Sequence, residues 1–295
     1  MSVLKKILII FPLLIIFYLI ADVGRYLVFP NIASLKEDKP GKTAFMEYRE
    51  EMWRQQGIDK KIINTWVPLS RISPYVVKAV IIAEDDKFWS HEGFDFEAMQ
   101  QALEKDIKKK KFQAGGSTIS QQLAKNLYLS PSKNPVRKIK EAIITWRMEK
   151  ELPKKRIIEL YLNVAEMGDG IFGVEAAAQT HYRKHASGLT AREAATLASI
   201  LPNPRRYKPN GASRYVENRS ERIYRIMLRR GIVIPEYEEV VKETEAEEEK
   251  AHENPDNDSQ IIDDQKTNSQ KIDDQKIEEK PEAEQADVDT ESSSK

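Results

Sequence analysis

An apolar run at the N-terminus constrains this chain more than any other feature. Fifteen residues without a charge, Ile7–Ala21, follow a pair of lysines. A membrane span needs about 20 residues, so a tilted span over about 4–29 would place Asp22 and Arg25 at the far interface. A cleaved signal peptide is the alternative, but no convincing small-x-small cleavage site follows the run. We expect an uncleaved anchor, with the lysines holding the N-terminus in the cytoplasm and the body outside.

The charges divide the rest of the chain into two regions. Residues 241–295 carry 19 acidic and 7 basic side chains, a net charge of −12, which leaves +12 for residues 1–240. A basic body indicates anionic partners such as nucleic acid, phospholipid headgroups or a phosphorylated substrate. The chain has no cysteine, which excludes a disulfide framework, a thiol nucleophile and a Cys-ligated zinc.

Four segments follow from these patterns. We expect a cytoplasmic stub and anchor over 1–29, a linker leading into the body over 30–70, a helical body over 71–232 and an acidic tail over 233–295. Residues 243–295 nearly repeat a ten-residue unit and have no aromatic side chain, so we expect the tail to be disordered. Capping residues and prolines predict helices in the body at about 73–86, 95–109, 118–127, 134–151, 153–165, 190–201 and 216–229. No alternation typical of strands appears, so the expected fold class is mainly α.

One helix of the body runs straight into three carboxylates. Residues 76–83 are nearly all apolar, and Glu84, Asp85 and Asp86 follow at once. A carboxylate at the lip of an apolar helix is partly desolvated, which raises its pKa. Such a group suits a general base or acid near neutral pH. The alternative is a helix surface that simply turns polar at its end.

The stretch QAGGSTISQQLAKNLYLS, 113–130, has the composition of a binding site. Two glycines allow close approach of a ligand, and the helix that follows offers free N–H groups and a dipole to an anion. One face of this helix suits a diphosphate or sugar hydroxyls, and the alternative is an ordinary capped amphipathic helix. The face offers Ser117 or Thr118, Gln121 and Lys125, with Gln122 and Asn126 beside them.

A third stretch, NPVRKIKEAIITWRMEK, places two cations beside a carboxylate. Arg137, Lys138 and Glu141 share one side of the predicted helix, and the cations keep Glu141 ionised. The group suits a phosphate, held directly or through a metal ion. The alternative is an ordinary surface ion pair worth about 0–1 kcal/mol.

Taken together, these stretches resemble glycosyltransferase family 51, the peptidoglycan glycosyltransferases. The resemblance covers about residues 65–230 and is most similar to the monofunctional biosynthetic enzymes of Gram-negative bacteria. It rests on Glu-Asp-x-x-Phe-x-x-His-x-Gly (84–93), Gly-Gly-Ser-Thr-x-x-Gln-Gln-Leu-x-Lys-Asn (115–126), Arg-Lys-x-x-Glu (137–141) and Lys-x-x-Ile-x-Glu-x-Tyr-Leu-Asn (154–163).

The resemblance implies a lysozyme-like helical head with a small membrane-proximal jaw in the cell inner membrane, its catalytic domain in the periplasm. It also implies polymerisation of lipid II into β-1,4-linked strands, with undecaprenyl diphosphate leaving. Glu84 would be the general base, and Glu141 would stabilise the leaving diphosphate with Lys125, Arg137 and Lys138. The implied substrate-binding set is Asp85, His91, Gly116, Ser117, Thr118, Gln121, Gln122, Lys125, Asn126, Arg137, Lys138 and Asn163.

The implied partners are lipid II, the growing strand and the membrane, with cell-wall synthesis or division proteins left open and nucleic acid not expected. A divalent cation such as Mg²⁺ at Glu141 also stays open, and no organic cofactor is implied. Three rival functions remain: a strand-cleaving enzyme of the lysozyme or lytic type, a non-catalytic scaffold, and a nucleic-acid binder. Gln121 and Lys125, together with Arg137 and Lys138, suit a lipid-diphosphate substrate, which argues against a cleaving enzyme. The presence of both Glu84 and Glu141 argues against a scaffold. The N-terminal anchor argues against a nucleic-acid binder.

Overall fold

The computed structural model describes residues 3–109, 115–132 and 134–233, and these residues are mainly helical, as predicted. The acidic tail predicted from 233 on lies outside the described residues, apart from Val233 itself. The helices are α1 (Val3–Gly24), α2 (Ala44–Gln55), α3 (Pro74–Glu84), α4 (Phe96–Lys109), α5 (Ile119–Tyr128), α6 (Pro135–Glu151), α7 (Lys154–Val164), α8 (Val174–Tyr182), α9 (Ala191–Ile200) and α10 (Arg214–Arg229). Four short 3₁₀ turns join them: η1 (Arg25–Leu27), η2 (Ala33–Lys36), η3 (Leu69–Arg71) and η4 (Ala186–Gly188).

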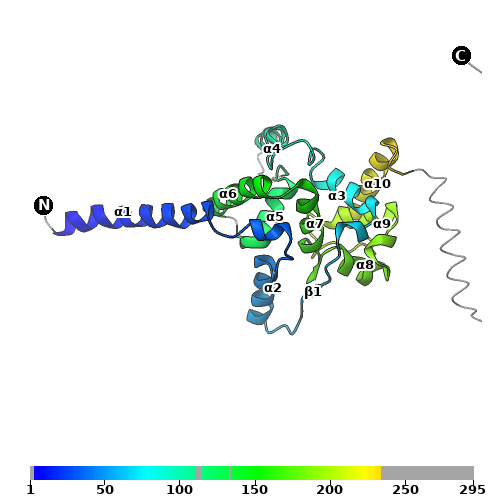
Figure 1. Cartoon of the computed structure of the whole chain (residues 1–295), viewed down its shortest axis with the longest axis horizontal. Coiled ribbons are helices and arrows are strands. Elements are labelled where there is room, and N and C mark those ends of the chain that lie inside the picture. The colour runs from blue at the N-terminus through cyan, green and yellow to red at the C-terminus, as the bar shows by residue number, and fades with distance from the viewer. Residues whose placement is uncertain (1–2, 110–114, 133, 234–295) are drawn as a thin grey trace, which may run out of the picture. The chain divides into compact units, whose positions relative to one another are not determined.

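Helix α1 and the 3₁₀ turn η1 that follows it contain an 18-residue window, Ile10–Leu27, with a mean hydropathy of 1.8. This length and composition fit a single-pass membrane anchor. The window's apolar side chains are largely exposed, and Figure 1 shows α1 as one continuous helix leading into the body. Ionic and backbone contacts hold its end to α6: Asp22 pairs with Lys140, and Arg147 donates to the carbonyl oxygens of Tyr26 and Val28 at 3.1 and 2.9 Å.

The starts of the helices follow the predicted signals, with one exception. Asn134 accepts a hydrogen bond from the Val136 N–H at 2.8 Å, and Thr190 forms the predicted capping box with Glu193. Ser73 precedes α3 as predicted, but its hydroxyl does not cap the helix. It donates instead to the Leu189 carbonyl at 2.8 Å, and this bond ties the start of α3 to the segment before α9.

Two features of the structure were not predicted. Helix α2 lies inside the segment expected to be a linker; Thr43 caps it, and Trp53 is buried. Three short strands also form one sheet in the order β1-β3-β2, where β1 (Ile63–Asn64) is parallel to β3 (Ile171–Phe172) and β2 (Glu166–Gly168) is antiparallel to it. Strands of two or three residues are too short to show an alternating pattern.

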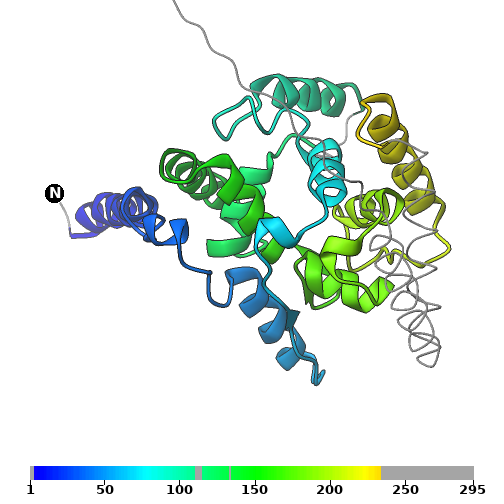
Figure 2. The same ribbon diagram turned by 45° about the vertical axis from the view of Figure 1, so that its right-hand side comes forward.

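The packing of two helix groups positions the end of α3. Helix α3 packs on α9, which packs on α10, while α5 packs on α2, α6 and α7 (Figure 2). Val76, Ala79 and Val80 are fully buried on α3. Burial of each valine stabilises the fold by roughly 1.5–3 kcal/mol. The apolar part of α3 is therefore core, as predicted, and it fixes the position of its last residue, Glu84.

Candidate active site

Glu84 lies at the C-terminal end of α3 with only 11% of its side chain exposed. One carboxylate oxygen accepts from the Gln122 amide at 2.9 Å, and the other accepts from the Arg219 guanidinium at 3.2 Å. The Tyr161 hydroxyl in turn donates to Gln122 at 3.0 Å. Burial raises the pKa of Glu84, and the hydrogen bonds from Gln122 and Arg219 act in the opposite direction. The carboxylate is thus fixed in place and is a better base than an exposed one.

The residues that follow Glu84 connect the loop after α3 to the start of α5 by hydrogen bonds. Asp85 is buried; it bonds His91 Nε2 at 2.8 Å and accepts from the Ile119 N–H at 2.9 Å. The Gly93 N–H donates to His91 Nδ1 at 3.0 Å, so the other ring nitrogen, Nε2, is the one that faces Asp85. Gly93 has a φ of +92°, and a Cβ there would lie 2.9 Å from atoms of Glu149 and Thr145. Asp85 and His91 therefore hold the backbone that carries Glu84.

Three residues of the predicted binding stretch 113–130, Gly116, Ser117 and Thr118, line a hollow of about 440 Å³ beside Glu84. The hollow lies between the end of α3, the start of α4 and the segment before α5, and Arg222 of α10 closes one side. Gly116 belongs to its wall, and a Cβ there would lie 3.2 Å from Met99 Cα and 3.3 Å from Ala102 Cβ of α4, so a side chain at this position would be tight. The predicted site residues in this wall are Glu84, Asp85, Gly116, Ser117 and Thr118.

The helix face of α5 divides between structure and site. Thr118 and Gln121 form a capping box and are 2% exposed each, so their polar groups serve the helix start. The alternative of a capped helix holds for this pair. Gln122, Lys125 and Asn126 instead line a second hollow of about 220 Å³ on the other side of the Glu84–Gln122 hydrogen bond.

Glu141 lies on the buried side of α6, 2% exposed, with both oxygens paired to cations. Arg137 Nη1 lies 2.5 Å from one oxygen, and Lys138 Nζ contacts the other and also donates to the Ser117 hydroxyl at 3.2 Å. The pair is therefore not an ordinary surface ion pair, because its carboxylate is buried. The contact with Ser117 joins the Glu141 cluster to the hollow beside Glu84.

Lys125 links the two glutamates electrostatically. Burial lowers the pKa of Lys125, and the negative charges of Glu141 and Glu84 both oppose that change. Its ammonium lies 5.5 Å from the centre of the Phe45 ring on α2. A half-buried cation that interacts electrostatically with both carboxylates is suited to stabilise an anion that develops nearby.

Asn163 does not face either hollow. It is fully buried; its amide accepts from the Val67 N–H and donates to the carbonyl oxygens of Val67 and Glu159, all at 2.9 Å. These three bonds of the side-chain amide are all to backbone groups, so the expectation that Asn163 contacts substrate is not supported by its position. Its place in the motif is explained by packing of the 64–67 segment on α7.

Comparison with known proteins shows the family of this chain. A family model described as Transglycosylase matches residues 51–228. The chain belongs to the transglycosylase family. It is therefore an enzyme that transfers glycosyl groups, a glycosyltransferase.

Relatives of this transglycosylase share much of its sequence, and each match covers a larger share of the relative than of this chain. A protein of Methylobacillus flagellatus is 47% identical over 64% of this chain and 83% of its own, and one of Nitrosospira multiformis is 44% identical over 70% and 90%. One of Aromatoleum aromaticum is 55% identical over 57% and 74%. All three are named biosynthetic peptidoglycan transglycosylase.

The side chains around Glu141 are not those of a metal site. Both oxygens of Glu141 are taken by Arg137 and Lys138, and a cation would have to displace one of them. The described residues contain no group of three or more histidines and carboxylates suited to a metal ion. The expectation of Mg²⁺ at Glu141 finds no support in these residues, and no step of the chemistry below runs through a metal.

The structure adds residues that the expected set of site residues did not include. Arg219 of α10 contacts Glu84, Tyr161 of α7 supports Gln122, and Phe45 and Arg49 of α2 line the second hollow. Tyr161 belongs to the fourth motif, which was a signal for it. Arg219 and the α2 residues lie far from the motifs in sequence, and only packing brings them to the site.

Arg49 and Glu166 form a buried ion pair whose disruption we expect to destabilise the fold. Two guanidinium nitrogens lie 2.7 Å from the two carboxylate oxygens, and the side chains are 10% and 5% exposed. Arg49→Met should lower the free energy of unfolding by about 3–5 kcal/mol because it leaves Glu166 buried without a partner. Denaturant unfolding of the purified chain measures this, and Arg49→Met combined with Glu166→Leu should recover most of the loss. A single variant as stable as the wild type would contradict the prediction.

Proposed function

We propose that this chain polymerises lipid II into peptidoglycan glycan strands at the outer face of the cell inner membrane. The family and the names of its relatives support the substrate class, and α1 supports a single-pass anchor with the N-terminus in the cytoplasm. The observation that carries the proposal is the placement of Glu84 and Glu141. Glu141 is buried, the Glu84 side chain is only 11% exposed, each is held by protein donors, and Lys125 feels the charge of both.

The proposed reaction is an inverting glycosyl transfer. Glu84 removes the proton from the 4-hydroxyl of the acceptor sugar while that oxygen attacks the anomeric carbon of the growing chain. The C–O bond to undecaprenyl diphosphate breaks on the opposite face, so the α linkage of the donor becomes a β-1,4 linkage. The division of labour between two faces is that of inverting glycosidases.

The leaving diphosphate would meet the Glu141 cluster. Negative charge develops on the diphosphate in the transition state, and Lys125, Arg137 and Lys138 are the cations placed to stabilise it. Glu141 holds Arg137 and Lys138 in position through its two oxygens. Ser117, which bonds Lys138, and Gly116 beside it would contact the donor in the hollow next to Glu84.

The test is the reaction of the purified full chain with labelled lipid II in detergent or in bilayers. We expect long strands that a β-1,4-muramidase digests completely. Shortening of preformed strands without polymer would favour the cleaving enzyme, and binding of lipid II without turnover would favour the scaffold. Retention of nucleic acid in place of lipid II would favour the third rival.

The pH dependence of the polymerisation rate should reflect the burial of Glu84. A protonated carboxyl cannot accept a proton, so the rate is retained above the pKa of Glu84 and lost as the pH falls through it. Because burial raises that pKa, the loss should begin above the ordinary glutamate value of about 4.3. Initial rates from pH 4 to 9, at saturating lipid II, measure this. An acid limb at or below the ordinary value would contradict the proposed environment of the base.

A further inference from the structure

We propose that Arg219 of α10 is a positioning residue for Glu84, which holds the carboxylate in the orientation and the charge state that proton abstraction requires. The inference rests on the proposed role of Glu84 as the base. It adds a residue that lies outside all four motifs and acts through Glu84.

One nitrogen of Arg219 joins the carboxylate to the backbone. Nη2 donates to Glu84 at 3.2 Å and to the Ala83 carbonyl oxygen at 3.0 Å. Carbonyl groups in the last turn of a helix have no partner within the helix, and an arginine there also opposes the negative end of the helix dipole. Arg219 therefore fixes Glu84 relative to the end of α3.

The second carboxylate oxygen is held from the opposite side. Gln122 of α5 donates to it, and Tyr161 of α7 fixes Gln122. Two bonds from separate elements leave the carboxylate little rotational freedom. Because Gln122 is neutral, Arg219 is the one group among the described residues that brings a formal positive charge into hydrogen-bond contact with Glu84.

The positive charge of Arg219 affects the protonation of Glu84, because the carboxyl group is largely removed from water. Burial raises the pKa of Glu84, and the hydrogen bond and the charge of Arg219 both counteract that change. Other groups contribute charge as well. The titratable and charged groups that face Glu84 or the hollow beside it are Lys125 on α5, Tyr161 on α7, Arg219 and Arg222 on α10, Glu97 on α4 with Asp95 before it, and Asp85, Asp86 and Lys87 on its own loop.

The guanidinium of Arg219 is only partly satisfied by hydrogen bonds, which is unusual for an arginine with a purely structural role. Its Nε is buried and, among the described residues, is a side-chain donor without a hydrogen-bond partner. Unpaired buried donors cost free energy, are rare, and call for an explanation such as a functional role. Arg219 also lines a hollow of about 450 Å³ between α3 and α10. Its position beside Glu84 is better explained by the reaction than by the packing of α10.

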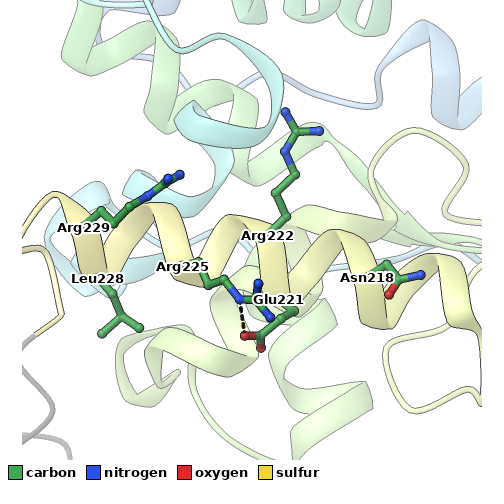
Figure 3. A pocket seen from close by; sticks show the side chains of 6 residues that line it. All are labelled: Asn218, Glu221, Arg222, Arg225, Leu228 and Arg229. Carbon is green, nitrogen blue, oxygen red and sulfur yellow. Dashed lines mark hydrogen bonds and ion pairs between the residues drawn. The ribbon is translucent and has the colours of Figure 1, made fainter.

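The same helix offers a matched control. Figure 3 shows Arg222, Arg225 and Arg229 along α10, with Arg225 bonded to Glu221 of its own helix. That bond measures 2.8 Å, and the Arg225 side chain is 70% exposed. Arg225→Gln removes the same charge from the same helix without touching Glu84.

The experiment is the pH profile of strand polymerisation by the full chain for wild type, Arg219→Gln, Arg219→Met, Arg219→Lys and Arg225→Gln. We expect the neutral Arg219 variants to lose about tenfold in rate on the acid side and to approach wild type at alkaline pH, because removal of the cation shifts the acid limb upward. Arg219→Lys should keep the limb near the wild-type position, at a somewhat lower rate because an ammonium lacks the planar fork of donors. Arg225→Gln should match wild type throughout.

Several results would overturn the proposal. An unshifted limb in the neutral variants, with the same fractional loss at every pH, would indicate a structural role. A limb displaced as far in Arg219→Lys as in the neutral variants would show that the charge is not responsible. Thermal unfolding of each variant identifies those that fold, and either neutral variant suffices for the comparison. Full activity of Glu84→Gln is a separate outcome, which would refute the base and not Arg219 alone.

Discussion

Replacement of Glu84 by glutamine should reduce the rate of strand polymerisation by about 10²–10⁴-fold, the range that a positioned general base contributes. The amide has the size of the carboxylate and retains an oxygen that accepts from Gln122, so the local packing should persist. It cannot take a proton from the acceptor hydroxyl. Initial rates with labelled lipid II measure the loss, and binding of lipid II by the variant should stay close to wild type.

Glu221 of α10 provides the control for this experiment. Its side chain is 41% exposed and pairs with Arg225 at 2.8 Å, outside the hollow beside Glu84. Glu221→Gln makes the same chemical change as Glu84→Gln and should change the rate by less than about twofold, because exposed ion pairs contribute little. Near-wild-type polymerisation by a folded Glu84→Gln variant would remove Glu84 from the mechanism.

Replacement of Lys125 by methionine should lower the turnover rate by about 10²–10³-fold, as removal of one preorganised donor from a transition-state anion does in other enzymes. The charge on the diphosphate develops as the bond breaks, so kcat should fall more than KM rises. Methionine keeps an apolar stem of similar length against Phe45. Because burial lowers the pKa of Lys125, the charged form is disfavoured in the fold and its loss should cost little stability.

Lys150 is the matched lysine for this test. It is exposed on α6 and lies over the Trp146 ring at 4.1 Å, away from both glutamates. Lys150→Met should leave kcat and KM near wild type. If Lys125→Met changes KM alone, Lys125 binds the ground state of the donor and does not stabilise its departure.

The outcome at α5 shows how a motif can combine two functions. Thr118 and Gln121 carry the signature of a binding row and of a capping box equally well, and in the structure they cap the helix. Lys125 and Gln122 lie one turn further on and line a hollow. The sequence could not separate the two groups, because burial depends on how α5 packs against α2, α6 and α7.

The sequence by itself determined the local features of this protein. Prolines and capping residues placed most helix starts, the apolar run before Glu84 predicted a core helix ending in a carboxylate, and the i, i+4 spacing joined Arg137 to Glu141. These features depend on neighbours within one or two helical turns, so the order of residues is sufficient to predict them.

Only the tertiary structure decided which distant groups meet at Glu84. Arg219 is 135 positions away in sequence, on a helix with several arginines of similar local context, and α2 occupies a segment that reads as a linker. Asn163 belongs to the 154–163 motif and was expected to contact substrate, yet it binds the backbone of Val67. Contacts of this kind are set by the packing of α3 against α9 and α10 and of α5 against α2, which no local pattern encodes.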